Sequence, residues 1–242
     1  MIDMIGAITG TAVYAVVVGI LVGFSPASGP AKQAKLSAFA AAAAWGGILV
    51  AVAALGGFAP GATGPVPAPL FAFAGLLALL FGGWSLSPRF RSALLSVPLP
   101  ALVGLNAGRL GGVFFLILAA DGRLSAPFAP VAGAGDILVG ALAIPLAAMA
   151  AAGAGAPLAW LGVWNALGAL DLIVAVSLGV LSAPGTPFRV FTEGPGTAAM
   201  TTLPWIMVPA ILVPLYLLIH FTIAAKLRSL QPTTHQAVAM AR

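Results

Sequence analysis

The chain has 242 residues, of which 61% are hydrophobic and 6% charged, and ten Lys and Arg against five Asp and Glu give a net charge of +5. A soluble globular domain is about one quarter charged, so this composition indicates an integral membrane protein. The positive charge does not indicate a nucleic-acid surface, because most basic residues lie in short stretches between apolar runs, where they meet lipid headgroups. No cysteine is present, which excludes disulfides, thiolate nucleophiles, cysteine-ligated zinc and iron–sulfur clusters.

Seven apolar segments have the length, about 20 residues, that is needed to cross a bilayer as helices. They lie near residues 5–27, 36–58, 69–87, 98–120, 127–151, 158–183 and 203–226. The first segment has no basic leader and is too long for a signal-peptide core, so we expect it to be retained. The fold class predicted is an all-α integral membrane protein, a seven-helix transmembrane bundle. We expect a single polytopic membrane domain over residues 1–230 and a polar cytoplasmic tail over 231–242.

The loops between these segments alternate in basic content, which predicts the orientation of the bundle. One set of alternate loops and the C-terminus carry Lys32, Lys35, Arg89, Arg91, Lys226, Arg228 and Arg242, and the other set carries Arg123 and Arg189. The positive-inside rule makes the first set cytoplasmic. The N-terminus is then predicted outside and the C-terminus inside, in a multi-pass protein of the bacterial inner membrane. The longest loop, 184–202, is expected to pack back on the mouth of the bundle.

Four ionisable residues, Arg109, Asp136, Asp171 and His220, lie well inside apolar segments. A charge at the centre of a membrane helix costs about 2.5 to 3.5 kcal/mol on insertion scales, so such residues need partners and usually mark function. Counting residues from the predicted cytoplasmic ends places Arg109, Asp136 and Asp171 in one layer near mid-membrane. The same count places Asn106, Asn165 and His220 in a second layer nearer the cytoplasm.

Two aromatic residues share helix faces with these polar residues. Trp164 is seven residues before Asp171, and Tyr216 is four residues before His220 in a segment that follows several prolines. We therefore predict a ligand-binding or proton-relay site that is formed by helices four to seven. Its predicted members are Arg109, Asp136, Asp171, His220, Asn106, Asn165, Trp164 and Tyr216.

The mid-membrane layer holds one cation and two carboxyl groups. If both aspartates were ionised, the layer would be net negative in a poor dielectric, so one aspartate should be protonated or balanced by a bound cation or a ligand amine. The alternative is purely structural: a fixed pair between Arg109 and Asp171 staples two helices while Asp136 is protonated and hydrogen-bonded. His220 likewise has two interpretations, a helix–helix hydrogen bond to Asn165 or Asn106, or a proton relay.

Several chemistries are not expected. No cofactor and no metal site are predicted, because His220 is the single histidine within a span and no His/Glu cluster or phosphate-binding loop is present. Seven spans with an external N-terminus occur in microbial rhodopsins, but the lysine that would hold retinal in the middle of the last helix is missing, since Lys226 lies at the helix end.

The leading functional hypothesis is a small membrane carrier or ligand-binding protein, in which proton coupling is one mechanism. Arg109 would hold an anionic group or a partner carboxylate, and Asp136 or Asp171 would exchange a proton. The alternative is a non-catalytic accessory or anchoring subunit of a larger membrane complex, for which short loops are equally natural. An enzyme ranks third, because only the aspartates offer general acid–base chemistry. The partners expected are the lipid bilayer, together with a small ligand or protons, other membrane subunits or a homo-oligomer, and no nucleic acid.

Overall fold

The computed structural model describes residues 1–24, 31–153 and 158–230. These residues form an all-helical protein, with 78% helix and no strand among them. Seven helices are long and apolar enough to cross a membrane, which confirms the predicted helical class and number of spans and indicates a multi-pass membrane protein. Which end faces the cytoplasm stays a prediction. The predicted tail 231–242, including His235, lies outside the described residues.

The described helices have the following bounds. They are α1 (Ile2–Gly23), α2 (Ala31–Ala54), α3 (Ala68–Leu86), α4 (Pro88–Ser96), α5 (Leu99–Leu105), the 3-10 helix η1 (Asn106–Gly112), α6 (Val113–Ala120), α7 (Phe128–Ala151), α8 (Leu158–Leu181), the 3-10 turn η2 (Ala198–Thr201), the π-helical turn η3 (Val208–Leu212) and α9 (Val213–Leu230).

Three of these elements differ from the expected pattern. The predicted gap 88–97 contains the short helix α4, whose first turn is capped by the Ser87 hydroxyl accepting from the Phe90 amide at 3.2 Å. The fourth span is interrupted by η1, so it consists of α5, η1 and α6 in succession. The seventh span begins at Val208 rather than near 203.

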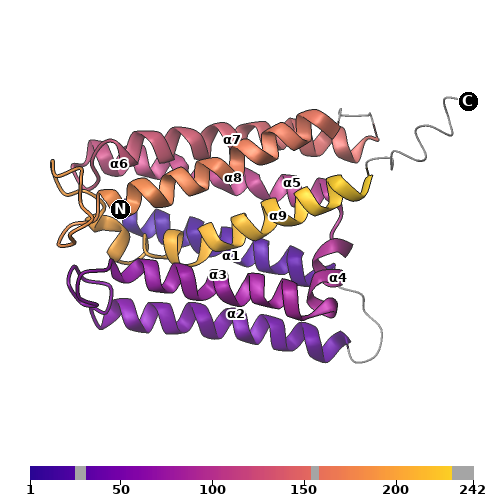
Figure 1. Cartoon of the computed structure of the whole chain (residues 1–242), viewed down its shortest axis with the longest axis horizontal. Helices are drawn as coiled ribbons and strands as arrows, with labels where there is room; N and C mark the ends of the chain where they lie inside the picture. The colour runs from indigo at the N-terminus through magenta and orange to yellow at the C-terminus, as the bar shows by residue number, and fades with distance from the viewer. Residues whose placement is uncertain (25–30, 154–157, 231–242) are drawn as a thin grey trace, which may run out of the picture.

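The long helices run side by side along the bundle (Figure 1). In this view α7 and α8 lie on one side, α2 and α3 on the other, and α1 and α9 between them. The N-terminus and the end of α9 lie at opposite ends of the bundle, as an odd number of spans requires.

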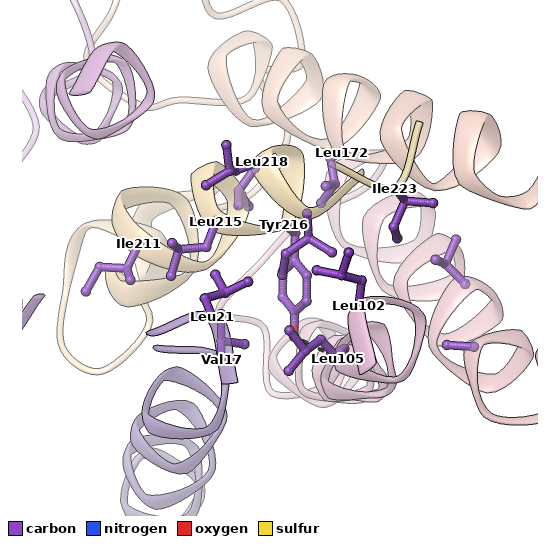
Figure 2. Close-up of a cluster of buried hydrophobic side chains, with 14 of the residues drawn as sticks. Val17, Leu21, Leu102, Leu105, Leu172, Ile211, Leu215, Tyr216, Leu218 and Ile223 are labelled. Atoms are coloured by element: carbon purple, nitrogen blue, oxygen red, sulfur yellow. Dashed lines mark hydrogen bonds between the residues drawn. The ribbon is translucent and has the colours of Figure 1, made fainter. Parts of the chain in front are cut away.

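The hydrophobic core is built around α9. Its buried side chains pack against those of α5 and α1, and Figure 2 shows the Tyr216 ring beside Leu102 and Leu105, with Leu21 nearby. In the most apolar 18-residue window of the span Val208–Leu230, 61% of the residues are buried, whereas none are buried in the corresponding window of α3. The seventh span is therefore the centre of the bundle, and α3 lies at its edge.

Prolines in the seventh span leave a backbone carbonyl that the bundle satisfies. Pro214 has no N–H to donate to the carbonyl of Ala210, four residues earlier. The indole of Trp45 on α2 donates to that carbonyl at 3.4 Å. A neighbouring helix thus supplies the bond that proline removes, as a membrane interior requires.

The loop after α8 packs back on the bundle mouth, as expected. The Ser125 amide donates to the Gly196 carbonyl at 3.1 Å, the Gly196 amide returns a bond to the Ser125 hydroxyl at 3.0 Å, and the Thr197 hydroxyl donates to the Gly179 carbonyl at 3.1 Å. Arg189 closes the loop on itself by donating to the carbonyls of Phe191, Thr192 and Gly194. This loop therefore covers the end of the bundle at which the N-terminus lies.

Candidate functional site

The central arginine lies on the 3-10 segment of the fourth span. A 3-10 helix has three residues per turn, so residues three apart lie above one another on one face. In η1 that face consists of Asn106, Arg109 and Gly112, which are its three buried residues. The side chain of Arg109 is fully covered, with 0% of its surface exposed. The local backbone therefore aims the guanidinium at the interior of the bundle.

The guanidinium of Arg109 binds acceptors from three other helices. Its Nε donates to Asp136 Oδ1 of α7 at 2.7 Å, and its Nη2 donates to Asp171 Oδ2 of α8. Its Nη1 donates to the Gly168 carbonyl of α8 at 3.0 Å and lies 3.1 Å from His220 Nε2 of α9. One side chain thus joins all four of the last spans.

Glycines make this approach feasible. A Cβ on Gly112 would lie 2.5 Å from the Asp136 Cβ, and one on Gly140 of α7 would lie 2.8 Å from the backbone nitrogen of Leu110. A Cβ on Gly135 would collide with the carboxylate of Asp171, and one on Gly168 would meet the His220 ring at 2.5 Å. Small residues let the backbones of η1 and α7 come together and leave room for the polar groups between the helices.

The hydrogen bonds of His220 assign its tautomer. Asn165 donates from Nδ2 to the backbone carbonyl of His220 at 3.0 Å, so its Oδ1, 2.9 Å from His220 Nδ1, is the acceptor of the Nδ1–H bond. His220 Nε2 is then free of hydrogen and accepts from Arg109. His220 is therefore a neutral bridge between Asn165 and Arg109. The sequence allows two interpretations of His220, a helix–helix hydrogen bond and a proton relay. The contacts with Asn165 form the helix–helix hydrogen bond of the first interpretation.

Three other predicted residues lie around this network without a polar bond to Arg109. The Trp164 ring packs against the His220 ring with centroids 5.7 Å apart, and its indole donates to the Val139 carbonyl at 3.2 Å. The Tyr216 hydroxyl donates to the Leu105 carbonyl at 3.4 Å. Asn106 donates to the Leu102 carbonyl of its own helix, while its buried Oδ1 accepts no bond in the structure.

Two cavities reach this network. The first, which we call the outer cavity, lies between the start of α3 and the C-terminal half of α8, beneath the loop that closes the bundle mouth, and includes Asp136 among its lining residues. The second is lined by α1, η1 and the beginning of the seventh span and includes Asp136, Arg109 and Tyr216. Asp136 lines both, whereas Asp171 lines neither. The two aspartate side chains are covered to a similar degree, with 16% and 15% exposed.

Sequence reasoning missed two parts of the site. The Gly168 carbonyl accepts from Arg109, and no side-chain pattern marks a backbone acceptor. The outer cavity takes residues from loops 58–61 and 183–201, which are far from the polar residues in the sequence. Among the residues that the structure describes, no group of His, Cys, Asp or Glu could hold a metal ion.

A family model matches residues 66–228, about two thirds of the chain. The chain belongs to this family, which is described as "Domain of unknown function (DUF8737)". The matched range contains α3 to α8, α9 except for its last two residues, and all eight predicted site residues. No curated protein and no solved structure matches the chain.

Proposed function

We propose that this protein is a small carrier of the bacterial inner membrane in which Asp136 takes up and releases a proton or a small cation. The observation that supports this proposal is the position of Asp136, which shares the Arg109 guanidinium with Asp171 and also lines two cavities. An ionisable group that contacts open space within a membrane protein is typical of an ion or proton pathway.

The charges of the network favour a cation over an anion as the exchanged species. The side chain of Arg109 is fully covered, although the residue lines the second cavity, and its donors face four protein acceptors, so the guanidinium offers no free surface to an anionic ligand. His220 is neutral in the assigned tautomer. One guanidinium therefore faces two carboxyl groups. The set is neutral only when one aspartate carries a proton or meets a bound cation.

The two aspartates have different surroundings, which support different roles for them in this proposal. The Asp171 carboxylate fits into the space left by Gly135 and lines neither cavity. Asp171 is the fixed partner of Arg109 and links α8 to the fourth span. Asp136, which lines both cavities, is the group that exchanges its proton.

The experiment is an infrared pH titration of the purified protein in lipid nanodiscs. A protonated carboxyl group has a C=O stretch separate from that of a carboxylate. We expect the difference between the wild-type and Asp136→Asn spectra to contain one such band, which titrates with pH. The amide oxygen that this substitution introduces can still accept from Arg109 Nε, so the variant retains the ion pair with Asp171 and should fold.

The matched control is Asp121→Asn, which makes the same chemical change at an exposed position. It should leave the band unchanged. A titrating band that is missing from the difference spectrum of the wild type against Asp136→Asn but present in that of the wild type against Asp171→Asn would show that Asp171, and not Asp136, exchanges the proton. The absence of a titrating band from both difference spectra would overturn the proposal. Proton flux into proteoliposomes that contain a pH-sensitive dye should be lost in Asp136→Asn and retained in Asp121→Asn.

Purification under native conditions tests the alternative role. A carrier should be isolated alone or as a homo-oligomer. Constant recovery with other membrane subunits would support an accessory or anchoring subunit instead.

A further inference from the structure

The outer cavity has an almost entirely apolar lining with a single charged group. The space within it, counted together with its open mouth, is roughly 910 Å³. Its side chains are supplied by α3, α6, α7, α8, the start of the seventh span and two loops. Asp136 is the one charged residue among those that line it.

The aromatic rings of the lining come from four separate segments. They are Phe58 in the loop after α2, Phe73 on α3, Phe115 on α6 and Phe128 on α7. Phe115 and Phe128 pack against each other with ring centroids 5.6 Å apart. Rings placed around a cavity provide apolar contact area, and their faces attract cations.

The lining side chains offer no free hydrogen-bond donor. The three hydroxyl groups, of Thr186, Thr197 and Thr201, already donate to the carbonyls of Ala183, Gly179 and Ala198. The polar side-chain atoms that face a ligand are therefore acceptors: hydroxyl lone pairs and the Asp136 carboxylate. A carboxylate or phosphate ligand would find no side-chain donor, whereas an ammonium group brings its own.

We infer that the outer cavity binds a lipophilic ammonium ion, whose amine contacts Asp136 and whose apolar body lies among the phenylalanine rings. This inference rests on the proposed function, because it identifies the cation that Asp136 exchanges with a proton. The amine supplies the positive charge that the network lacks when both aspartates are ionised. Its apolar part fills a space that side chains leave open.

The test is equilibrium binding of three probes of similar shape to the protein in nanodiscs. The probes are naphthylmethylamine, naphthalenemethanol and naphthoic acid, and empty nanodiscs measure the part that dissolves in lipid. We expect the amine to bind the wild-type protein about tenfold or more tightly than the alcohol, because a hydrogen bond to a charged group is stronger than a neutral one. The acid should bind no better than the lipid background.

Two variants separate the charge from the shape of the cavity. Asp136→Asn should abolish the preference for the amine over the alcohol, whereas Asp121→Asn should retain it. Ala175→Phe, which fills the cavity from α8, should weaken the binding of both amine and alcohol. Equal binding of amine and alcohol to the wild-type protein, a preference for the acid, or a preference that survives Asp136→Asn would each overturn the inference.

The outcome is distinguishable from that of the proposed function. If the infrared band of Asp136 titrates but the amine shows no preference, Asp136 exchanges protons and the inference about the ligand is wrong. If the amine binds with the expected preference but no band titrates, the cavity is an amine site and proton exchange at Asp136 is wrong.

Discussion

The last four spans and the first three are held in the bundle in different ways. In the most apolar 18-residue window of each span, 44% of the residues are buried in the fourth span and 61% in the seventh. The corresponding values are 6% in α2 and 0% in α3. Arg109 links the last four spans through ion pairs and hydrogen bonds. The helix α2 is joined to the rest of the bundle by isolated hydrogen bonds, such as that of Trp45 to the Ala210 carbonyl. Moving an apolar side chain from lipid into the bundle gains little free energy, because the acyl chains are equally apolar. Close packing and polar bonds therefore decide which helices associate most stably.

The largest effect is expected when the cation at the centre of that unit is removed. Arg109→Gln leaves two carboxyl groups covered without a positive partner and should lower the free energy of unfolding by about 3 to 5 kcal/mol. Unfolding in mixed micelles of mild detergent and dodecyl sulfate measures it. The control is Arg123→Gln, whose ion pair with Asp3 is exposed and should cost about 1 kcal/mol or less. Equal losses would show that Arg109 stabilises the bundle no more than a surface pair.

A matched pair of leucines tests the difference in packing. Leu218 on α9 is 1% exposed and Leu79 on α3 is 63% exposed. Leu218→Ala leaves a void among packed side chains and should cost about 3 kcal/mol. Leu79→Ala changes a lipid-facing surface and should cost less than about 0.5 kcal/mol in the same unfolding measurement. A cost at Leu79 as large as that at Leu218 would contradict the description of α3 as an edge helix.

The glycines around the network should be intolerant of a methyl group where they face a polar side chain. The Cβ of Gly135→Ala would collide with the Asp171 carboxylate and should cost about 2 kcal/mol. Gly162→Ala on α8 is the control, because no atom lies within 4 Å of its Cβ. If both variants were as stable as the wild type, the contact between α7 and Asp171 would be looser than the structure has it.

The smallest effect is expected at the link between α2 and the seventh span. Trp45→Phe removes the bond to the Ala210 carbonyl and should cost about 0.6 kcal/mol, the average for hydrogen bonds between membrane helices. Trp160→Phe, at a position 66% exposed, is the control. A loss as large as that of Arg109→Gln would mean that both halves are anchored equally.

The sequence predicted the helical class, the seven spans and the common depth of Arg109, Asp136 and Asp171. This was feasible because charge in a bilayer is so costly that Arg109, Asp136 and Asp171 at a common depth had to meet. The sequence placed His220, which lies 3.1 Å from the Arg109 guanidinium, in a separate layer. The second predicted layer was only partly right: Asn165 binds His220, but Asn106 binds its own helix. Counting residues from the ends of the spans predicted the depth of each side chain in the membrane. It did not predict the rotation of each helix about its axis, and that rotation decides such contacts.

Two features could not have been predicted from the pattern of residues. The 3-10 helix η1 is a glycine-rich segment against which α7 packs closely, and no residue pattern distinguishes its winding from that of an α-helix. The outer cavity is formed where helices and loops leave space, and empty space has no signature in an apolar sequence. The ligand proposed for it rests on the phenylalanine rings and the bonded threonines that line the cavity with Asp136.

The winding of η1 determines how far α5 and α6, the two ends of the fourth span, are rotated and separated along the helix axis. A 3-10 helix turns about 120° and rises about 2.0 Å per residue, against about 100° and 1.5 Å in an α-helix. Over the seven residues of η1 the difference accumulates to about 140° of rotation and about 3.5 Å of length. Rewinding this stretch as α-helix would therefore turn α5 against α6 by more than a third of a revolution, and the guanidinium could not keep its present partners on α7, α8 and α9.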